Sequence, residues 1–367
     1  MIGQKIQERL RRAQDEVHAM AIAMLLPFFQ DQSMNAFVRE QNGCRSHKTC
    51  CALLCGVIIS CAVFWPGHAR AQAGDAVLPG RVFRPAADGG FEFDTGVLRG
   101  RLAKGAKPLG LTDVVHVPSG ARLDGSNGLL SHYRVFTRGK RYGGGAWDWP
   151  CKVQQLSDAV VEIVWPAEPG RPFELRARYE WLSPTRIELR TTVVPSARLE
   201  AFEAFLASYC SPAFTNAMVL AKDGGDAGAV PVLKHALKAA GDWQMFARDE
   251  LAREVIMDGR WKLPPNPVDW AVYPVLAKPV GVRRAESLGL SFVLIGTPGD
   301  CFAIATPHES EGHYSMYLCL WGRDMEAGRS ATTRTRLELV SGDVNAVVGP
   351  LFDDFMRGAP RRWRLPD

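Results

Sequence analysis

Hydrophobic and polar residues alternate with a period of two along much of the chain. In residues 173–181 (FELRARYEW), Phe173 and Leu175 fall on one face of an extended segment and Glu174 and Arg178 on the other. Charged residues on one face are typical of antiparallel sheets with one solvated face. Further strands are predicted at residues 91–98, 109–117, 129–137, 159–166, 186–194, 288–295, 301–305, 313–321 and 331–339.

Few segments have the pattern of a helix. Residues 232–240 and 247–257 are predicted helices, and residues 345–356 are a predicted closing helix. Residues 199–209 (LEAFEAFLASY) have helical propensity, but they continue a series of strands and are assigned as a strand.

Ten or more predicted strands without an alternating βαβ rhythm indicate an all-β protein. The expected fold is a large two-sheet antiparallel β-sandwich with a short helical insertion and a C-terminal helix. No linker-like segment divides residues 74–367, so they are predicted to form a single domain.

The N-terminal part has the pattern of an export signal. Arg45 and Lys48 precede an uncharged, hydrophobic stretch at residues 49–65, and Ala-Gln-Ala at residues 71–73 predicts cleavage after Ala73. Because export signals normally begin at the chain start, either translation begins at Met34 or the segment stays uncut as a short membrane anchor. The cleavage site favours the first explanation. The predicted location is periplasmic or extracellular, and residues 1–73 are excluded from the predicted domain.

Charge and cysteine content narrow the function classes. Residues 74–367 carry 36 Lys and Arg against 34 Asp and Glu, a formal net charge of about +2, which gives no electrostatic reason to expect nucleic acid or an anionic membrane as partner. Five of the nine cysteines precede residue 74. The other four are Cys151, Cys210, Cys301 and Cys319. They have no C-x-x-C spacing, which argues against a structural zinc site. Cys301 and Cys319 are predicted buried thiols, and a disulfide is possible in an oxidising compartment.

The richest polar segment is residues 127–150 (NGLLSHYRVFTRGKRYGGGAWDWP). Flat aromatic rings beside a carboxylate, arginines and a histidine suit a sugar, which has apolar C–H faces and a rim of hydroxyls. The same side chains also suit an ordinary sandwich core and its solvated rim. The candidate contacts in this segment are His132, Arg134, Arg141, Trp147, Asp148 and Trp149.

A second polar concentration lies at residues 306–324 (TPHESEGHYSMYLCLWGRD) and contributes His308, Glu309, His313 and Arg323 as candidates. Two histidines beside carboxylates can perform acid–base chemistry or coordinate a metal. Their spacing is not that of H-E-x-x-H, so no metal ligand and no cofactor is assigned. Loop histidines without any chemical role are the alternative.

A histidine-bearing strand (GLLSHYRVF), an aromatic-acid segment (AWDWP) and a late histidine region (PHESEGHYSMYLCLWGRD) together resemble the galactose-mutarotase-like sandwich, over about residues 85–355. That superfamily includes aldose 1-epimerases and β-sandwich domains of sugar-processing hydrolases and lyases. The resemblance implies a histidine acid, which chain order matches to His132 or His308. The family's C-terminal glutamate motif is missing, and only Glu338 is nearby.

The expected function is recognition or processing of a carbohydrate, with His132 or His308 as proton donor and Glu309 or Asp148 as base. Arg134, Arg141, Trp147, Trp149, His313 and Arg323 would then contact the sugar. A non-catalytic envelope module that binds glycan or protein is the alternative, and a glycoside hydrolase or polysaccharide lyase is a second one. The expectation requires residues 127–150 and 306–324 to share one cleft.

Overall fold

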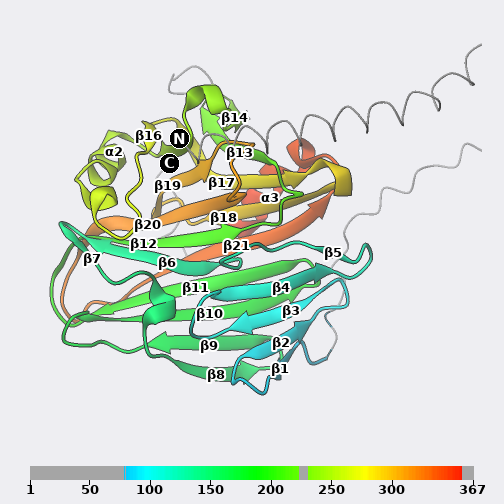
Figure 1. Ribbon diagram of the computed structural model, residues 1–367, viewed down its shortest axis with the longest axis horizontal. Helices are drawn as coiled ribbons and strands as arrows, with labels where there is room; N and C mark the ends of the chain where they lie inside the picture. The colour runs from blue at the N-terminus through cyan, green and yellow to red at the C-terminus, as the bar shows by residue number, and fades with distance from the viewer. Residues whose placement is uncertain (1–77, 79, 223–229, 358–367) are drawn as a thin grey trace, which may run out of the picture. The chain divides into compact units, whose positions relative to one another are not determined.

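The computed structural model describes residues 78, 80–222 and 230–357, which lie within one compact unit, Arg70–Asp367. The predicted export signal, its cleavage site and both candidate start residues lie outside the described residues (Figure 1). Within those residues, no helix is both long and apolar enough to cross a membrane.

Two large sheets dominate the described part of the chain (Figure 1). The larger has the order β14 (Pro231–His235), β13 (Asn216–Lys222), β17 (Leu276–Ala285), β18 (Leu290–Gly296), β21 (Ala331–Ser341), β11 (Arg186–Pro195), β10 (Phe173–Ser183), β9 (Val160–Trp165) and β8 (Lys152–Ser157). The smaller has the order β16 (Ala271–Tyr273), β15 (Trp243–Ala247), β19 (Cys301–Pro307), β20 (Ser315–Met325), β12 (Leu199–Tyr209), β6 (Ser131–Thr137) and β7 (Lys140–Arg141). Every pairing in these two sheets is antiparallel except β15 with β16.

The N-terminal strands form a separate five-stranded antiparallel sheet, an addition to the two sheets expected from the sequence. It contains β1 (Phe83–Pro85), β2 (Phe91–Asp94), β3 (Leu98–Ala103), β4 (Gly110–His116) and β5 (Ala121–Arg122). Phe93 packs against Trp181 of β10 with ring centroids 5.0 Å apart, so this sheet shares the core of the larger one.

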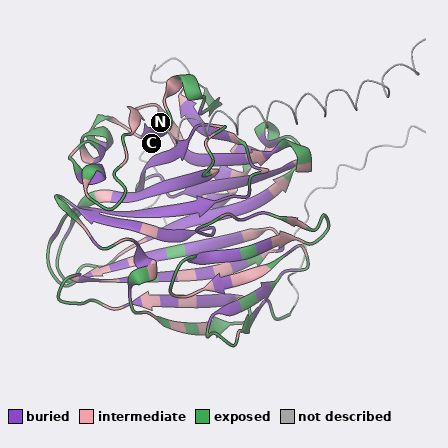
Figure 2. Ribbon diagram, viewed as in Figure 1, coloured by how far each residue is buried: buried purple, intermediate pink, exposed green. Residues whose placement is uncertain are grey.

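The inner faces of the two large sheets form one hydrophobic core. Strand β10 contributes Phe173, Leu175 and Tyr179, the face predicted from its alternation, and all three are fully buried. The Tyr179 hydroxyl donates a 2.8 Å hydrogen bond to the Leu130 carbonyl at the start of β6 and so links the layers. Figure 2 shows the buried residues running along both sheets. The fold is therefore an antiparallel β-sandwich, as predicted.

Helices cover the outer faces of the sheets. Helix α3 (Val344–Arg357) packs Val348, Phe352 and Phe355 on the larger sheet and confirms the predicted closing helix. On the smaller sheet, α2 (Glu250–Ile256) and the 3-10 turn η4 (Arg260–Lys262) cover a second hydrophobic layer. Short 3-10 turns also occur at η2 (Ala146–Asp148), η3 (Lys238–Ala240) and η5 (Glu286–Leu288).

The predicted strand at 199–209 is confirmed as β12, whereas the helix predicted at 232–240 is wrong. Strand β14 occupies residues 232–235 and the short turn η3 occupies residues 238–240, because pairing of β14 with β13 satisfies its backbone groups and overrides the helical propensity of its residues. The helix predicted at 247–257 is shorter than expected. Ala247 ends β15, and α2 begins only after Asp249, whose side chain accepts a 2.8 Å hydrogen bond from the Ala252 amide.

The four cysteines within the described residues are free thiols. Cys301 and Cys319 are buried, as predicted, on β19 and β20. Burial raises the pKa of the Cys301 thiol to about 12, so it stays protonated at neutral pH.

His132 belongs to the sandwich core. Its side chain is fully buried, its Nε2 lies 3.0 Å from the Thr191 hydroxyl of β11, and its ring lies 5.5 Å from that of Trp165. Burial lowers the pKa of His132 to about 3, so the imidazole is neutral in the folded protein near pH 7.

This burial makes stability depend on pH. Below about pH 6.5 the unfolded chain protonates His132, whereas the folded protein does not until about pH 3. We expect the free energy of unfolding to fall by about 1.4 kcal/mol for each unit by which the pH is lowered across that window. His132→Gln should reduce this slope in urea unfolding series, and the exposed His235→Gln is the matched control for loss of an imidazole. Equal slopes in wild type and His132→Gln would contradict the assignment.

Candidate functional site

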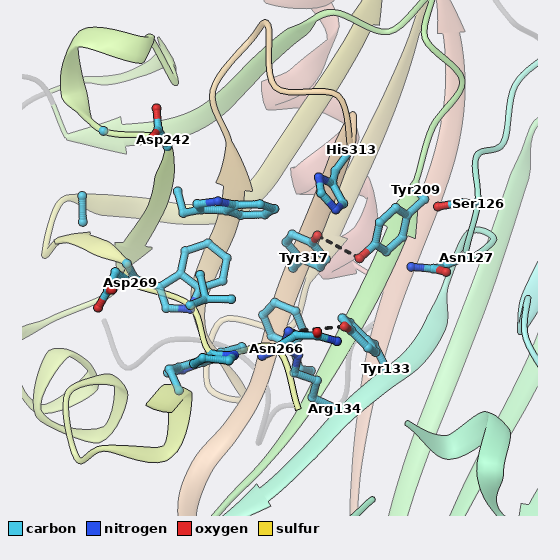
Figure 3. A pocket seen from close by; sticks show the side chains of 18 of the residues that line it. Ser126, Asn127, Tyr133, Arg134, Tyr209, Asp242, Asn266, Asp269, His313 and Tyr317 are labelled. Atoms are coloured by element: carbon cyan, nitrogen blue, oxygen red, sulfur yellow. Dashed lines mark hydrogen bonds between the residues drawn. The ribbon is translucent and has the colours of Figure 1, made fainter. Parts of the chain in front are cut away.

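A cavity of about 710 Å³ lies on the outer face of the smaller sheet, away from the sandwich core. Strands β6, β12, β15 and β20 contribute to it, together with the segment that follows α2 (Figure 3). Its aromatic lining consists of Tyr133, Phe205, Tyr209, Trp243, Trp261, Trp270 and Tyr317. Its polar lining includes Lys107, Ser126, Asn127, Arg134, Asp242, Asn266, Asp269 and His313.

The floor of the cavity follows from alternation along β12. Leu206 packs in the sandwich core, whereas Phe205 and Tyr209 point to the outer face. Phe205 stacks on Tyr317 of β20 with ring centroids 4.5 Å apart, and Tyr209 meets Tyr317 edge-on at 5.8 Å. Both faces of these strands are therefore buried, which explains why β12 lacks an alternating polar pattern.

A β-bulge in β6 brings two side chains to the same face. Phe205 pairs with Arg134 and the next residue of β12 pairs with His132, so Tyr133 is an extra residue in the ladder. Tyr133 and Arg134 therefore both line the cavity, while His132 points into the core. Without the bulge, His132 and Arg134 would share one face.

The turn after β7 supports this bulge. Trp147 of η2 stacks on Tyr133 with ring centroids 4.9 Å apart. A Cβ atom at Gly145 would lie 2.7 Å from both the Tyr133 carbonyl oxygen and the Trp147 ring, so only glycine allows this approach. Arg141 donates hydrogen bonds to the carbonyls of Gly143 and Gly144 and thereby holds the same turn.

A buried ion pair holds the opposite wall. Arg260 of η4 donates a 2.8 Å hydrogen bond to Glu203 of β12, and both side chains are fully buried. Its Nη2 atom also donates to the Ala201 carbonyl at 3.0 Å and to Asp258 at 2.8 Å. Burial raises the pKa of Glu203, and the charge of Arg260 opposes that rise. These bonds fix η4 over the sheet.

The ion pair places the tryptophans. Trp261 packs against Phe136 at 5.0 Å and Phe205 at 4.8 Å, and Trp270 meets Trp261 edge-on at 5.3 Å. Trp243 of β15 continues the wall, 5.7 Å from Trp270. The indole nitrogens of Trp261 and Trp270 have no hydrogen-bond partner among the described residues. The wall thus combines flat rings with unused N–H donors.

His313 enters the cavity from the turn between β19 and β20 (Figure 3). Its Nδ1 lies 2.7 Å from the Glu311 carboxylate, and its ring lies 5.1 Å from that of Trp243. Arg283 of β17 anchors the ends of this turn through 2.8 Å hydrogen bonds to the Ser315 carbonyl and the Thr306 hydroxyl. A carboxylate at Nδ1 fixes the imidazole and leaves Nε2 for a ligand.

A chain of hydroxyl groups lies beneath His313. Ser315 donates to the Tyr317 hydroxyl at 2.6 Å. Tyr317 in turn donates to the Tyr209 hydroxyl at 3.1 Å (Figure 3). Burial raises the pKa of both tyrosines. Both phenols therefore stay protonated near neutral pH and can act as neutral hydrogen-bond donors.

Arg134 is the buried cation of the cavity. Only 5% of the residue is exposed, and its guanidinium lies 4.8 Å from the Tyr133 ring and 5.2 Å from the Trp261 ring. Its Nη2 donates to the Tyr133 hydroxyl at 3.3 Å. Its Nε and Nη1 atoms have no hydrogen-bond partner in the part of the chain that the structure describes.

The structure brings only part of the predicted site together. Arg134 and His313 line the cavity, so segments 127–150 and 306–324 do share one hollow. Trp147 and Arg141 do not line the cavity themselves. Trp147 stacks on the lining residue Tyr133, and Arg141 holds the turn after β7 that carries Trp147.

The other predicted residues lie elsewhere. His132 is in the core, Asp148 is exposed on η2, and Trp149 packs against Phe173 and Arg171. His308 is buried with Nε2 3.6 Å from Asp242, Glu309 is half-buried, and Arg323 pairs with Asp300 at 2.7 Å. None of these six is among the lining residues.

Several lining residues were missed from the sequence, notably Tyr209, Trp243, Trp261, Trp270 and Tyr317. Three tryptophans within residues 243–270, around a proline cluster, are the one signal that could have indicated them. Across the described ranges, no three His, Cys, Asp or Glu side chains are grouped as metal ligands.

Comparisons with known proteins found only solved structures of low similarity. No protein-family model and no curated protein matches the chain. The Slr1438 protein of Synechocystis sp. PCC 6803 is 13% identical with a TM-score of 0.42, over 72% of this chain and 99% of that one. A putative aldose 1-epimerase from Escherichia coli K12 is 12% identical with a TM-score of 0.37, over 67% of this chain and 97% of that one.

An α-N-acetylgalactosaminidase from Bifidobacterium bifidum is 12% identical with a TM-score of 0.41, over 77% of this chain and 39% of the enzyme. The similar solved structures thus include aldose 1-epimerase relatives, the group that the sequence resembles. Identities and TM-scores this low transfer no activity and no residue role to this chain.

The buried ion pair yields a stability prediction. Arg260→Met leaves Glu203 buried without its counter-ion, so we expect the free energy of unfolding to fall by about 3–5 kcal/mol in a denaturant titration. The control is Arg253→Met, because Arg253 is half-exposed and pairs with Glu250 on the surface of α2. That variant should lose less than about 1 kcal/mol. Similar losses in both variants would contradict the anchoring role of Arg260.

Proposed function

We propose that this protein recognises a carbohydrate in the cavity on the smaller sheet. The observation that carries the proposal is the lining itself, in which stacked aromatic rings alternate with Asn127, Arg134, Asp242 and His313. Sugar rings offer C–H faces to aromatic surfaces and hydroxyls to polar groups at their edges. The volume of about 710 Å³ lies within the usual range for small-molecule sites.

Acid–base chemistry on the bound sugar is the more specific form of this proposal. His313, held at Nδ1 by Glu311, is the proton carrier, and Nε2 is the nitrogen that would meet the ligand. The neighbouring Tyr209 hydroxyl is a neutral donor that can bind a ring or hydroxyl oxygen. This assignment replaces the donors expected from the sequence, since His132 and His308 do not line the cavity.

A non-catalytic glycan-binding module is the competing function. The aromatic walls suit sugar binding whether or not a reaction follows. Two carboxylates line the cavity, and their side chains are 69% exposed for Asp242 and 89% exposed for Asp269. The general acid of a glycosidase lies in surroundings shielded from water, and these two carboxylates do not. In either case we propose that the protein acts in the periplasm or outside the cell, on the basis of the export signal predicted from the sequence.

Loss of one aromatic wall tests the binding proposal. Trp270→Ala should weaken sugar binding about tenfold, because the ligand loses a stacking face. Titration of intrinsic tryptophan fluorescence with a panel of mono- and oligosaccharides measures this. Leu251→Ala, a truncation of a 72% exposed side chain on α2, is the control and should bind as wild type. Failure of every sugar in the panel to bind the wild type would refute the proposal.

Replacement of the histidine separates enzyme from binding module. His313→Gln should lower turnover of a bound sugar at least about a hundredfold while changing its affinity less than about threefold. Anomer exchange and bond cleavage can both be followed by NMR of the sugar. The control is His116→Gln on β4, outside the cavity. A wild type that binds sugar but gives no turnover, together with unchanged binding in His313→Gln, would favour the module.

A further inference from the structure

Arg134 has a charge that the protein does not balance. It takes part in no ion pair found among the described residues, although it is buried, with only 5% of the residue exposed. Its neighbours are the faces of Tyr133 and Trp261, which are attractive to a cation but carry no negative charge. The fully buried Arg283 also has no ion pair among the described residues, but its guanidinium nitrogens donate to carbonyls and to the Thr306 hydroxyl, whereas Nε and Nη1 of Arg134 have no partner there.

The groups nearest to Arg134 add positive charge. The pKa of Arg141 is lowered to about 10 by burial and then by the charge of Arg134, while the Asp148 carboxylate opposes this shift, so the two guanidinium groups are close to each other. Arg141 donates to the Gly143 and Gly144 carbonyls in the turn after β7 and to the Pro265 carbonyl in the segment after η4. Lys107 lines the same cavity and lies 5.7 Å from the Trp147 ring.

The negative groups of the cavity are placed elsewhere. Asp242 and Asp269 lie on the far side from Arg134 and Tyr133 in Figure 3. Asp269 forms an ion pair with Lys262, and Asp242 is the neighbour of His308. Glu311 is bound to His313. The Arg134 side of the cavity therefore has a positive potential that none of these carboxylates neutralises at contact distance.

A second unpaired group lies on the same side. Asn127 is 6% exposed, lines the cavity, and its Oδ1 atom has no hydrogen-bond partner within the described ranges. In Figure 3, Asn127 lies beside Tyr133 and Tyr209. A neutral hydroxyl of a ligand can donate to this oxygen while an anionic group of the same ligand faces Arg134.

We propose, resting on carbohydrate binding as the function of this cavity, that its ligand is an acidic sugar whose anionic group faces Arg134. A carboxylate on the sugar ring supplies the counter-ion that the buried guanidinium lacks, in surroundings where charge-assisted hydrogen bonds are strong. Lys107, which is exposed, adds attraction from the cavity mouth. The aromatic faces bind the rest of the ring.

The decisive ligands differ only in charge. We compare oligogalacturonate with the same oligosaccharide after methyl esterification, by calorimetry on the full chain. The wild type should bind the free acid at least about tenfold more tightly than the ester, because the free energy of a hydrogen bond to a charged group corresponds to an affinity ratio of that size. Added NaCl should weaken binding of the acid and leave the ester unchanged. Glucuronate oligosaccharides and sugar sulfates extend the comparison to other acidic sugars.

Protein variants locate the effect. Arg134→Gln should reduce the preference for the acid to within about twofold, and Lys107→Gln should reduce it about two- to threefold. The matched control is Arg138→Gln, which removes the same charge just after β6 from an exposed side chain paired with Glu200; it should keep the wild-type preference. If Arg134→Gln fails to fold, the comparison of acid with ester, the salt series and the Lys107→Gln variant still test whether the cavity prefers an acidic sugar.

The outcomes separate this inference from the function beneath it. Equal or tighter binding of the ester overturns the acidic-sugar inference and leaves carbohydrate binding intact. Absence of binding by every acidic and neutral sugar refutes the proposed function itself. Inorganic sulfate that competes as strongly as the oligogalacturonate also overturns the inference, because the cavity would then hold a simple anion.

Discussion

The cavity depends on one buried ion pair, Arg260 with Glu203. Two charges are removed from water, and this is tolerable only because Arg260 also binds Asp258 and the Ala201 carbonyl. The pair fastens η4 to the outer face of β12, so Trp261 must lie over Phe205. A hydrophobic contact alone would allow this segment to slide along the sheet, whereas the guanidinium has one register that satisfies all of its bonds.

The bulge in β6 makes the second essential contribution. Alternation in a regular strand would give His132 and Arg134 the same surroundings. The extra residue sends His132 to the Thr191 side of the strand and leaves Tyr133 and Arg134 together on the cavity side. Residues two positions apart therefore have different physical roles: an imidazole kept neutral by burial contributes to the core, and the Arg134 guanidinium lines the cavity.

This geometry also explains what the sequence could and could not predict. The period of two in β10 gave its buried face correctly, and the strand series led to the sandwich. Polar side chains marked two segments that do meet, through Arg134 and His313. The bulge, however, depends on pairing with β12, which no local pattern encodes. The tryptophan wall depends on Arg260 finding Glu203, fifty-seven positions away. Helical propensity at 232–240 yielded to strand pairing for the same reason.

The unpaired donors of the cavity connect its structure to ligand choice. Arg134, Trp261 and Trp270 each hold N–H groups without a partner in the described part of the chain, and Asn127 holds an unused acceptor. Buried polar groups of this kind destabilise the empty cavity. A low local dielectric strengthens each hydrogen bond that forms and increases the free-energy cost of each one that does not. A ligand that supplies hydroxyls and negative oxygen would satisfy these groups, whereas a purely apolar ligand would leave them unmet. The proposed carbohydrate site would therefore select its ligand through these unsatisfied polar groups as well as through its aromatic rings.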